Sequence, residues 1–192
     1  VAPRESARGA RAMAERACRA LAVVALTAAV KRGAPSRVVM ADMPFMSYQA
    51  DDAEALRNAG RFMTEGNADC VKIEADRTFA PLVEKMARAG IPVVAHVGSR
   101  PQQAKMKGGY VSTGRSAETA LRVLHDAAAL EAAGASMILV EACPAEVTQV
   151  IRHNQQDVRL ALGEGRGGEY GQDDGKDAHR IISAGLSRSL PL

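Results

Sequence analysis

The sequence predicts an α/β fold with a parallel sheet, and two observations support this prediction. Four short apolar runs, rich in Val and Ile, occupy residues 37–42, 69–74, 91–96 and 136–141. Each run is followed by a turn signal, which is typical of a buried strand. Segments of helical character separate the runs, and strands that alternate with helices form right-handed crossovers within a parallel sheet.

The segments between these runs carry the signals of helix ends. Asp51 or Asp52 can cap one helix, Ser116 can cap another, and Pro144 stands at the start of a third. The expected helices cover residues 10–32, 51–58 or beyond, 79–88, 116–133 and 144–153. A long loop is expected over residues 97–115.

Length and composition limit the class of protein. The chain has 192 residues, of which 47% are hydrophobic and 3% aromatic, with no Trp. This length and this hydrophobic content are sufficient for one domain whose core is built from Ala, Val, Leu, Ile and Met. The net charge is only +3, and charges of both signs are mixed along the chain. We therefore expect no nucleic-acid partner, which would require a clustered basic face.

The cysteines and the N-terminal region bear on the cellular compartment. Cys18, Cys70 and Cys143 form no C-x-x-C pair and no disulfide framework, which fits a reducing cytoplasm. Arginine-rich residues 4–19 precede an apolar stretch at 20–30, which is too short to span a bilayer, since that takes about 20 residues. We expect an Ala-rich helix here rather than a signal peptide, no membrane association, and a cytoplasmic protein.

The end of the chain changes character. Residues 163–175 are glycine-rich and polar, with neither strand alternation nor a helical period. We expect an irregular or disordered tail over residues 156–192. Gly163, Gly165 and Gly168 match G-x-G-x-x-G, but no clear strand precedes them and no clear helix follows, so the match is weak evidence for a dinucleotide site.

Polar residues mark the ends of the four apolar runs. They are Asp42, Lys72, Glu74, His96 and Glu141. In a parallel α/β barrel the C-terminal ends of the strands converge on one mouth, so we expect these side chains to gather there. Each has a structural explanation when taken singly, such as a cap or a buried ion pair. Their occurrence at four successive strand ends favours an active site.

Each of these residue types suits a particular chemical role. Asp42 is the best metal candidate, because Mg²⁺ takes one or two protein carboxylates together with water and substrate oxygens. Lys72 and Glu74 lie two residues apart and share a strand face, where Lys72 would hold a substrate carboxylate or oxo group and Glu74 would support the metal site. His96 would donate a hydrogen bond to an anionic substrate. We expect the pKa of Glu141 to be raised at its apolar strand end, as a general base requires.

Longer segments around these residues resemble the ketopantoate hydroxymethyltransferase family. They lie at residues 31–35, 41–49 (ADMPFMSYQ), 68–74, 90–98, 101–102, 108–110, 114–115, 129–135 and 140–144. Their order and spacing are specific, and the resemblance covers roughly residues 26–150. It implies a non-matching N-terminal helix at 1–25, a partial (β/α) barrel domain at 26–155 and the irregular tail at 156–192.

The resemblance implies a fold, a reaction and residue roles. The family is a (β/α)₈ TIM barrel that transfers a hydroxymethyl group from 5,10-methylenetetrahydrofolate to 3-methyl-2-oxobutanoate in pantothenate biosynthesis, with Mg²⁺ chelating the 2-oxo acid. By motif, Asp42 is similar to a metal-binding aspartate and Glu74 to the carboxylate near the metal. Lys72 and His96 are similar to substrate-binding residues, and Glu141 to the catalytic acid/base. Small-molecule partners and a homo-oligomer are implied.

The chain also departs from the family pattern. No G-D-S motif with a second metal aspartate precedes Asp42. About four to five βα units are recognisable, so we expect an incomplete barrel, since a whole one typically takes about 250 residues. Weak or no turnover by this chain alone is expected. The alternatives are an inactive remnant or fragment that associates with full-length subunits, and a Mg²⁺-dependent 2-oxo-acid lyase or mutase of a related barrel group.

Overall fold

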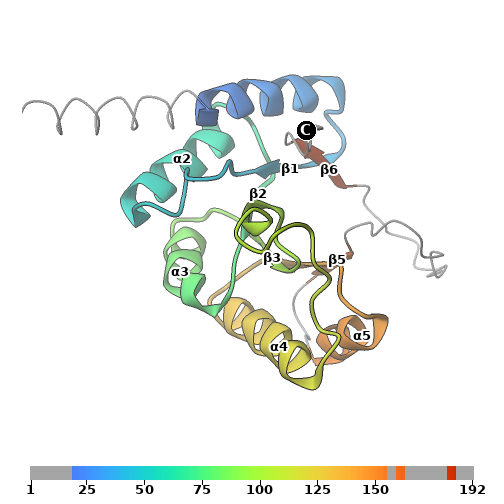
Figure 1. Cartoon of the computed structure of the whole chain (residues 1–192). Helices are drawn as coiled ribbons and strands as arrows, with labels where there is room; N and C mark the ends of the chain where they lie inside the picture. Colours follow the sequence, from blue (N-terminus) through green and yellow to red (C-terminus); the bar gives the residue numbers. More distant parts are fainter. Residues whose placement is uncertain (1–18, 155–158, 163–180, 185–192) are drawn as a thin grey trace, which may run out of the picture. The chain divides into compact units, whose positions relative to one another are not determined.

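The computed structural model describes residues 19–154, 159–162 and 181–184. It confirms the predicted α/β fold, because four strands are each followed by a helix (Figure 1), as expected for four to five βα units. The chain divides into two compact units, one made of Val1–Val71 with Arg180–Leu192 and the other of Lys72–His179.

The first unit contains a helix over residues 19–33, β1, α2 and β6. The strands β1 (Val38–Asp42) and β6 (Ile181–Ala184) pair in parallel, and α2 spans Asp52–Thr64. Asp51 caps α2 by accepting the backbone N–H of Glu54 at 2.9 Å, as predicted. The helix at 19–33 buries one side chain in every three or four, which is the period of an amphipathic helix. Its buried residues are Ala20, Val23, Val24 and Thr27.

One carboxylate joins three segments of the first unit. Oδ2 of Asp69 accepts the Val39 backbone N–H at 2.7 Å and lies 2.7 Å from the Lys31 Nζ. The Lys31 ammonium also donates to the Arg37 carbonyl at 3.0 Å. Burial acts to raise the pKa of Asp69, but the hydrogen bonds from Lys31 and Val39 outweigh it and lower the pKa overall. Asp69 therefore fixes the end of the first helix against β1.

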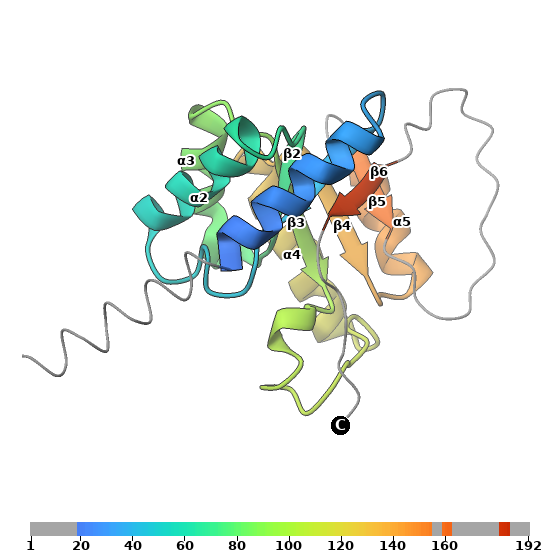
Figure 2. The same ribbon diagram turned by 90° about the horizontal axis from the view of Figure 1, so that it is seen from above.

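The second unit is built around parallel strands. Its elements after β2 (Cys70–Glu74), which spans the boundary between the units, are α3 (Ala80–Arg88), β3 (Val93–Gly98), α4 (Ala117–Ala132), β4 (Met137–Glu141), α5 (Ala145–Asn154) and β5 (Arg159–Leu162). Strand β3 pairs in parallel with β4, and β4 pairs in parallel with β5. Figure 2 shows the arrows of β3 and β4 pointing in one direction, toward the loop that precedes α4. The C-terminal ends of these two strands therefore share one edge.

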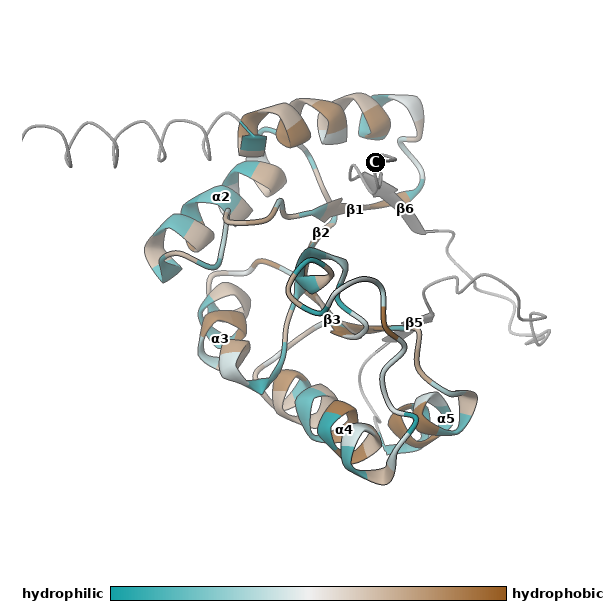
Figure 3. Cartoon of the chain, viewed as in Figure 1, coloured by the Kyte–Doolittle hydropathy of each residue, from teal (hydrophilic) through white to brown (hydrophobic). Residues whose placement is uncertain are grey.

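The helix α4 is central to the packing of the second unit. It contacts α3, α5, β3 and β4. Ser116 and Thr119 form a capping box at its start, which confirms the predicted N-cap. Its buried residues Val123, Ala127 and Leu130 recur every three or four positions. Figure 3 shows both hydrophobic and hydrophilic residues along this helix, as expected when one side is covered.

Most predicted elements match the described ones, and the differences have simple reasons. The strand β3 continues past His96 to Gly98, because it pairs with β4 as far as Glu141. Two short strands, β5 and β6, occur in the segment 156–192, for which irregular structure was expected. Four residues each are too few to produce a recognisable period. The glycine-rich segment 163–175 and residues 10–18 of the expected first helix lie outside the described residues.

A helix that spans a bilayer must be about 20 residues long and predominantly apolar. Within the ranges that the structure describes, no helix is both long enough and apolar enough to do so.

Replacing Asp69 by Ala should lower the free energy of unfolding by about 2 kcal/mol, because the buried Val39 N–H would lose its acceptor. The ion pair with Lys31 contributes less, since the Asp69 side chain is 40% exposed. Urea denaturation followed by circular dichroism measures the change. The matched control is Glu65→Ala, which removes an equally short but exposed ion pair with Arg61 and should cost much less. Equal losses in the two variants would contradict the role given to Asp69.

Candidate active site

The second unit brings two of the predicted site residues into contact. His96 lies on β3 and Glu141 ends β4, and the Nε2 of His96 is 3.2 Å from Oε2 of Glu141. The imidazole is 1% exposed, whereas the Glu141 side chain is 28% exposed. This distance is that of an ion pair when the imidazole is protonated, although the angles are not those of a well-aligned hydrogen bond. The Nδ1 of His96 has no hydrogen-bond partner in the described part of the chain.

Backbone contacts between the loops after β3 and β4 fix this pair. The Ser99 N–H donates to the Glu141 carbonyl at 2.9 Å, and the Thr113 N–H donates to the Ala142 carbonyl at 3.0 Å. Gly98 has φ +91, and a Cβ there would lie 2.5 Å from the Glu141 carbonyl oxygen. Only glycine accommodates both the left-handed backbone and the close approach. The sequence at the end of β3 therefore permits the two loops to meet beside His96.

The electrostatics of Glu141 differ from the expectation. The imidazole of His96 is the largest influence and lowers the pKa of this carboxyl group; partial burial raises it, and the charges of His96 and Lys72 lower it further. The net pKa is lowered, so the predicted raised pKa is wrong. The reason is that positively charged neighbours outweigh the loss of solvent. Glu141 is therefore ionised at neutral pH and can accept a proton.

Lys72 and Glu74 are both buried on β2, at 8% and 6% exposure. The Lys72 ammonium is close enough to Glu141 for its charge to lower the pKa of that carboxyl group. The two oxygens of Glu74 accept the same backbone N–H, that of Gln102, at 2.9 and 3.2 Å. Lys72 thus shares the environment of the His96–Glu141 pair. Glu74 instead holds the start of the loop that follows β3.

A second carboxylate at the end of β2 was not predicted as part of the site. The carboxylate of Asp76 accepts a hydrogen bond from the Arg100 guanidinium at 2.7 Å and another from the Thr78 backbone N–H at 3.0 Å. Burial acts to raise the pKa of Asp76, but these hydrogen bonds lower it overall. The signal that could have found Asp76 is its position, two residues beyond Glu74. Arg100 offered no such signal, because its partner lies 24 residues away.

Asp42 and Glu74 are the candidates for a metal ion. Asp42 ends β1 in the first unit and is half-buried. Carboxylate oxygens are the ligands that Mg²⁺ prefers, and one or two of them suffice when substrate oxygens complete the shell. The donor chemistry of both residues fits this ion, although the Glu74 oxygens also accept the Gln102 N–H. In the described ranges, no three His, Cys, Asp or Glu side chains form a metal-binding group.

Cys70 and Cys143 are unsuited to nucleophilic chemistry. Burial raises the pKa of Cys70 to about 11, with a smaller effect from Asp69 in the same direction, and burial also raises the pKa of Cys143 to about 11. A thiolate is the reactive form of cysteine, and it is scarce at neutral pH when the pKa is this high.

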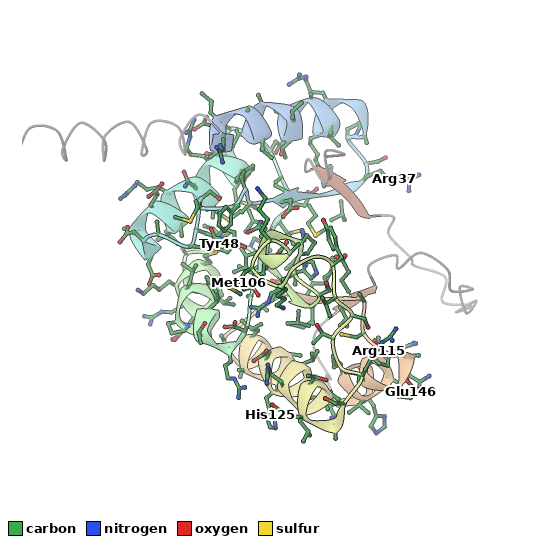
Figure 4. All side chains as sticks on the ribbon, viewed as in Figure 1. Arg37, Tyr48, Met106, Arg115, His125 and Glu146 are labelled. Carbon is green, nitrogen blue, oxygen red and sulfur yellow. The ribbon has the colours of Figure 1, made fainter. Side chains whose placement is uncertain are left out.

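The replacement His96→Asn should raise the pKa of Glu141 toward the ordinary value of about 4.3 for a glutamate. The pKa of Glu141 is lowered in the folded protein, so the pair stabilises the fold at pH values above the ordinary pKa of a glutamate. This stabilisation is lost as the pH falls through the pKa of Glu141 in the folded protein. Carboxyl-carbon NMR titration of labelled glutamate gives the pKa directly. His125→Asn is the matched control, because His125 is exposed on α4 (Figure 4). An unchanged Glu141 titration in His96→Asn would contradict the pairing.

Comparison with known proteins gives a consistent result. The family model for ketopantoate hydroxymethyltransferase matches residues 17–170. Three curated relatives named 3-methyl-2-oxobutanoate hydroxymethyltransferase illustrate the similarity. The relative from Carboxydothermus hydrogenoformans is 45% identical over 137 residues, which cover 71% of this chain and 50% of that protein. The relative from Syntrophus aciditrophicus is 43% identical, covering 73% and 52%. The relative from Pseudothermotoga lettingae is 41% identical, covering 73% and 53%.

The chain spans about half the length of the curated relatives it matches. The matched residues include part of each unit and every candidate site residue from Asp42 to Glu141. The resemblance found in the sequence is confirmed: the chain belongs to the ketopantoate hydroxymethyltransferase family.

Proposed function

We propose that this chain supplies the 2-oxo-acid and proton-transfer part of a 3-methyl-2-oxobutanoate hydroxymethyltransferase of pantothenate biosynthesis. The reaction transfers a hydroxymethyl group from 5,10-methylenetetrahydrofolate to 3-methyl-2-oxobutanoate. The observation that carries the proposal is the His96–Glu141 pair, which lies at adjacent strand ends in a member of this family. Such a pair provides an ionised carboxylate that is partly shielded from water and can accept a proton.

Lys72 is the proposed anion-binding residue. The substrate 3-methyl-2-oxobutanoate carries a carboxylate and an adjacent oxo group, and both develop or hold negative charge. A lysine ammonium that is 8% exposed interacts more strongly with such a charge than one in water. His96 holds Glu141 in its ionised form, and its Nδ1 is the remaining atom that can bind the substrate.

The proposed chemistry begins at the C3–H bond of the substrate. Glu141 takes the C3 proton, the C–H electron pair forms the C2–C3 double bond of an enolate, and the charge moves to the 2-oxo oxygen near Lys72. The methylene carbon of the folate takes up water and its bonds to both folate nitrogens break, which gives tetrahydrofolate and formaldehyde. The enolate carbon then bonds to the formaldehyde carbon, and the formaldehyde oxygen takes the proton held by Glu141 and becomes the hydroxyl group. Asp42 and Glu74 each offer a carboxylate to Mg²⁺, which when bound would supply Lewis-acid chemistry at the 2-oxo group.

The lowered pKa of Glu141 limits its strength as a base when it takes the C3 proton. A carboxylate that is ionised at neutral pH is always ready to accept a proton, but its basicity is low. The C3 proton must therefore be made more acidic, and this depends on stabilising the enolate charge. Lys72 provides one such contact from within the second unit.

The cellular compartment, the partners and the oligomeric state are also part of the proposal. We infer that it acts in the cytoplasm on small-molecule substrates, without nucleic acid or membrane partners, as a homo-oligomer. The thiols Cys70 and Cys143 are free in the structure, which agrees with a reducing compartment. Exposed apolar side chains such as Leu21 and Leu26 on the first helix are available for subunit contacts.

The chain should catalyse exchange of the C3 proton of 3-methyl-2-oxobutanoate for deuterium in D₂O with Mg²⁺ and without folate. The replacement Glu141→Gln should slow this exchange by about 100-fold or more, because the amide accepts no proton. Proton NMR of the substrate follows the exchange. Glu146→Gln is the matched control, since Glu146 is an exposed glutamate on α5 (Figure 4). Removal of Mg²⁺ with EDTA should also slow the exchange.

Two outcomes would count against this function. Equal exchange by the Glu141→Gln variant and the unmodified chain would remove Glu141 from the reaction. Absence of exchange from folded, soluble chain would favour the alternative of an inactive remnant that associates with full-length subunits.

A further inference from the structure

Two contacts join the end of β2 to the start of the loop that leads from β3 to α4 (Figure 2). Glu74 accepts the Gln102 backbone N–H, at 2.9 Å to one carboxylate oxygen and 3.2 Å to the other. Asp76 accepts a hydrogen bond from the Arg100 guanidinium at 2.7 Å. The two acceptors lie two residues apart on one segment, and the two donors lie two residues apart, in reverse order, on the other. Two contacts in this arrangement fix both the distance and the angle between the segments.

Arg100 and Gln102 belong to one rigid turn. The 3₁₀ turn η2 (Pro101–Gln103) follows Arg100 directly, and the Gln103 N–H donates to the Arg100 carbonyl at 2.9 Å. The ring of Pro101 fixes its φ angle, so the backbone between Arg100 and Gln102 has little freedom. Holding the Arg100 side chain therefore also holds the Gln102 N–H.

The segment that carries Asp76 is anchored on both sides. The Ala75 N–H donates to the His96 carbonyl on β3 at 2.9 Å. The Asp126 carboxylate on α4 accepts the Arg77 backbone N–H at 3.3 Å and lies 3.2 Å from the Arg77 Nε. Asp76 thus stands between two fixed neighbours, and it offers the loop a stationary point of attachment.

The Asp76–Arg100 pair is also partly shielded from water. The two side chains are 26% and 15% exposed, whereas those of the Glu118–Arg122 pair on α4 are 81% and 55% exposed. Solvent and salt screen a partly buried pair much less than an exposed one. The Asp76–Arg100 pair can therefore hold the turn in one position, whereas the exposed pair on α4 is expected to contribute little.

Glu74 is oriented by this arrangement. Its side chain is buried, and both of its oxygens face the same N–H, which limits rotation of the carboxylate. An ionised carboxylate has about four lone-pair sites, so one N–H leaves sites that can accept a water molecule or a divalent cation. Groups that orient a metal ligand from behind typically change the affinity for the metal by about 10- to 100-fold.

We infer that Asp76 and Arg100 are positioning residues: their ion pair holds the turn after β3, so that the Gln102 N–H keeps the Glu74 carboxylate in one orientation for binding Mg²⁺. This inference rests on the proposed function, in which Glu74 offers a carboxylate to that ion. Neither Asp76 nor Arg100 takes part in the proposed proton transfer. Both act through the main chain of the turn and through Glu74.

Amide hydrogen exchange of the full chain, followed residue by residue with NMR, tests the pair without any turnover. Arg100→Met and Asp76→Asn should each speed exchange of the Gln102 amide by about tenfold or more, because the turn then opens more often. The Ser99 amide, which is bound to the end of β4, should exchange as before. A general loss of stability would instead speed the exchange of both amides.

The choice of variants separates the ion pair from other effects. Arg100→Lys should behave like the unmodified chain, because the contact is made through Nη1, which an ammonium group can replace. Asp76→Asn keeps an oxygen that can accept the Thr78 N–H, so this local contact is retained. Arg122→Met is the matched control, since it removes the exposed partner of Glu118 at 2.8 Å. Circular dichroism establishes that each variant is folded.

Calorimetric titration of the full chain with Mg²⁺ tests the effect on the metal. Arg100→Met and Asp76→Asn should both raise the dissociation constant of Mg²⁺ by about tenfold. Charge alone would act in opposite directions, because loss of the Arg100 cation favours Mg²⁺ binding and loss of the Asp76 anion disfavours it. A weaker affinity in both variants therefore reports position rather than charge. In the C3 exchange reaction, both variants should need more Mg²⁺ for the half-maximal rate, with little change in the rate at saturating Mg²⁺.

Several outcomes would overturn the inference. They are an unchanged Gln102 amide in both variants, equal acceleration of the Ser99 amide, Mg²⁺ affinities that shift in opposite directions, and absence of Mg²⁺ binding by the unmodified chain. If the amide and Mg²⁺ results are as expected but the unmodified chain exchanges no C3 proton, the positioning role stands and the proposed function fails. Exchange that depends on Glu141, combined with an unchanged Gln102 amide in both variants, would show the reverse.

Discussion

The candidate active site depends on the close contact between the loops that follow β3 and β4. Gly98 makes this contact possible, because any side chain there would collide with the Glu141 carbonyl oxygen. The Ser99 N–H then binds the same carbonyl, so the backbone of Glu141 is held by the strand pair and by the loop together. A proton acceptor fixed in this way keeps its distance from His96, and little reorganisation is needed when a substrate arrives.

Charge balance is the second property that the site depends on. Lys72 and His96 are buried and Glu141 is half-buried, and a single charge at a buried position would be strongly disfavoured. Together they compensate one another, and the net effect is a lowered pKa for Glu141. A carboxylate at the end of an apolar strand is therefore not an isolated acid. Its protonation is decided by the residues on the neighbouring strands, which the local sequence does not reveal.

The sequence predicted the features that depend on residues close together in the chain. Apolar runs and caps such as Ser116 predicted the strands and helices, since both depend on residues within a few positions of one another. The polar strand ends also pointed to His96 and Glu141. Their mutual distance, the bond from the Gln102 N–H to Glu74 and the Asp76–Arg100 pair were not predictable, because each joins segments 24 or more residues apart. The strands β5 and β6 were missed because each has only four residues.

The carboxylate of Asp69 has a consequence for the order in which the first unit assembles. It joins Lys31 and Val39, which lie 38 and 30 residues away, whereas the pairing of β1 with β6 joins Val38 to Ile181. Closing the longer loop costs about 1 kcal/mol more chain entropy, since this cost grows with the logarithm of loop length. The contact at Asp69 thus forms at a lower entropic cost, and it can organise the first helix and β1 before the last strand is added.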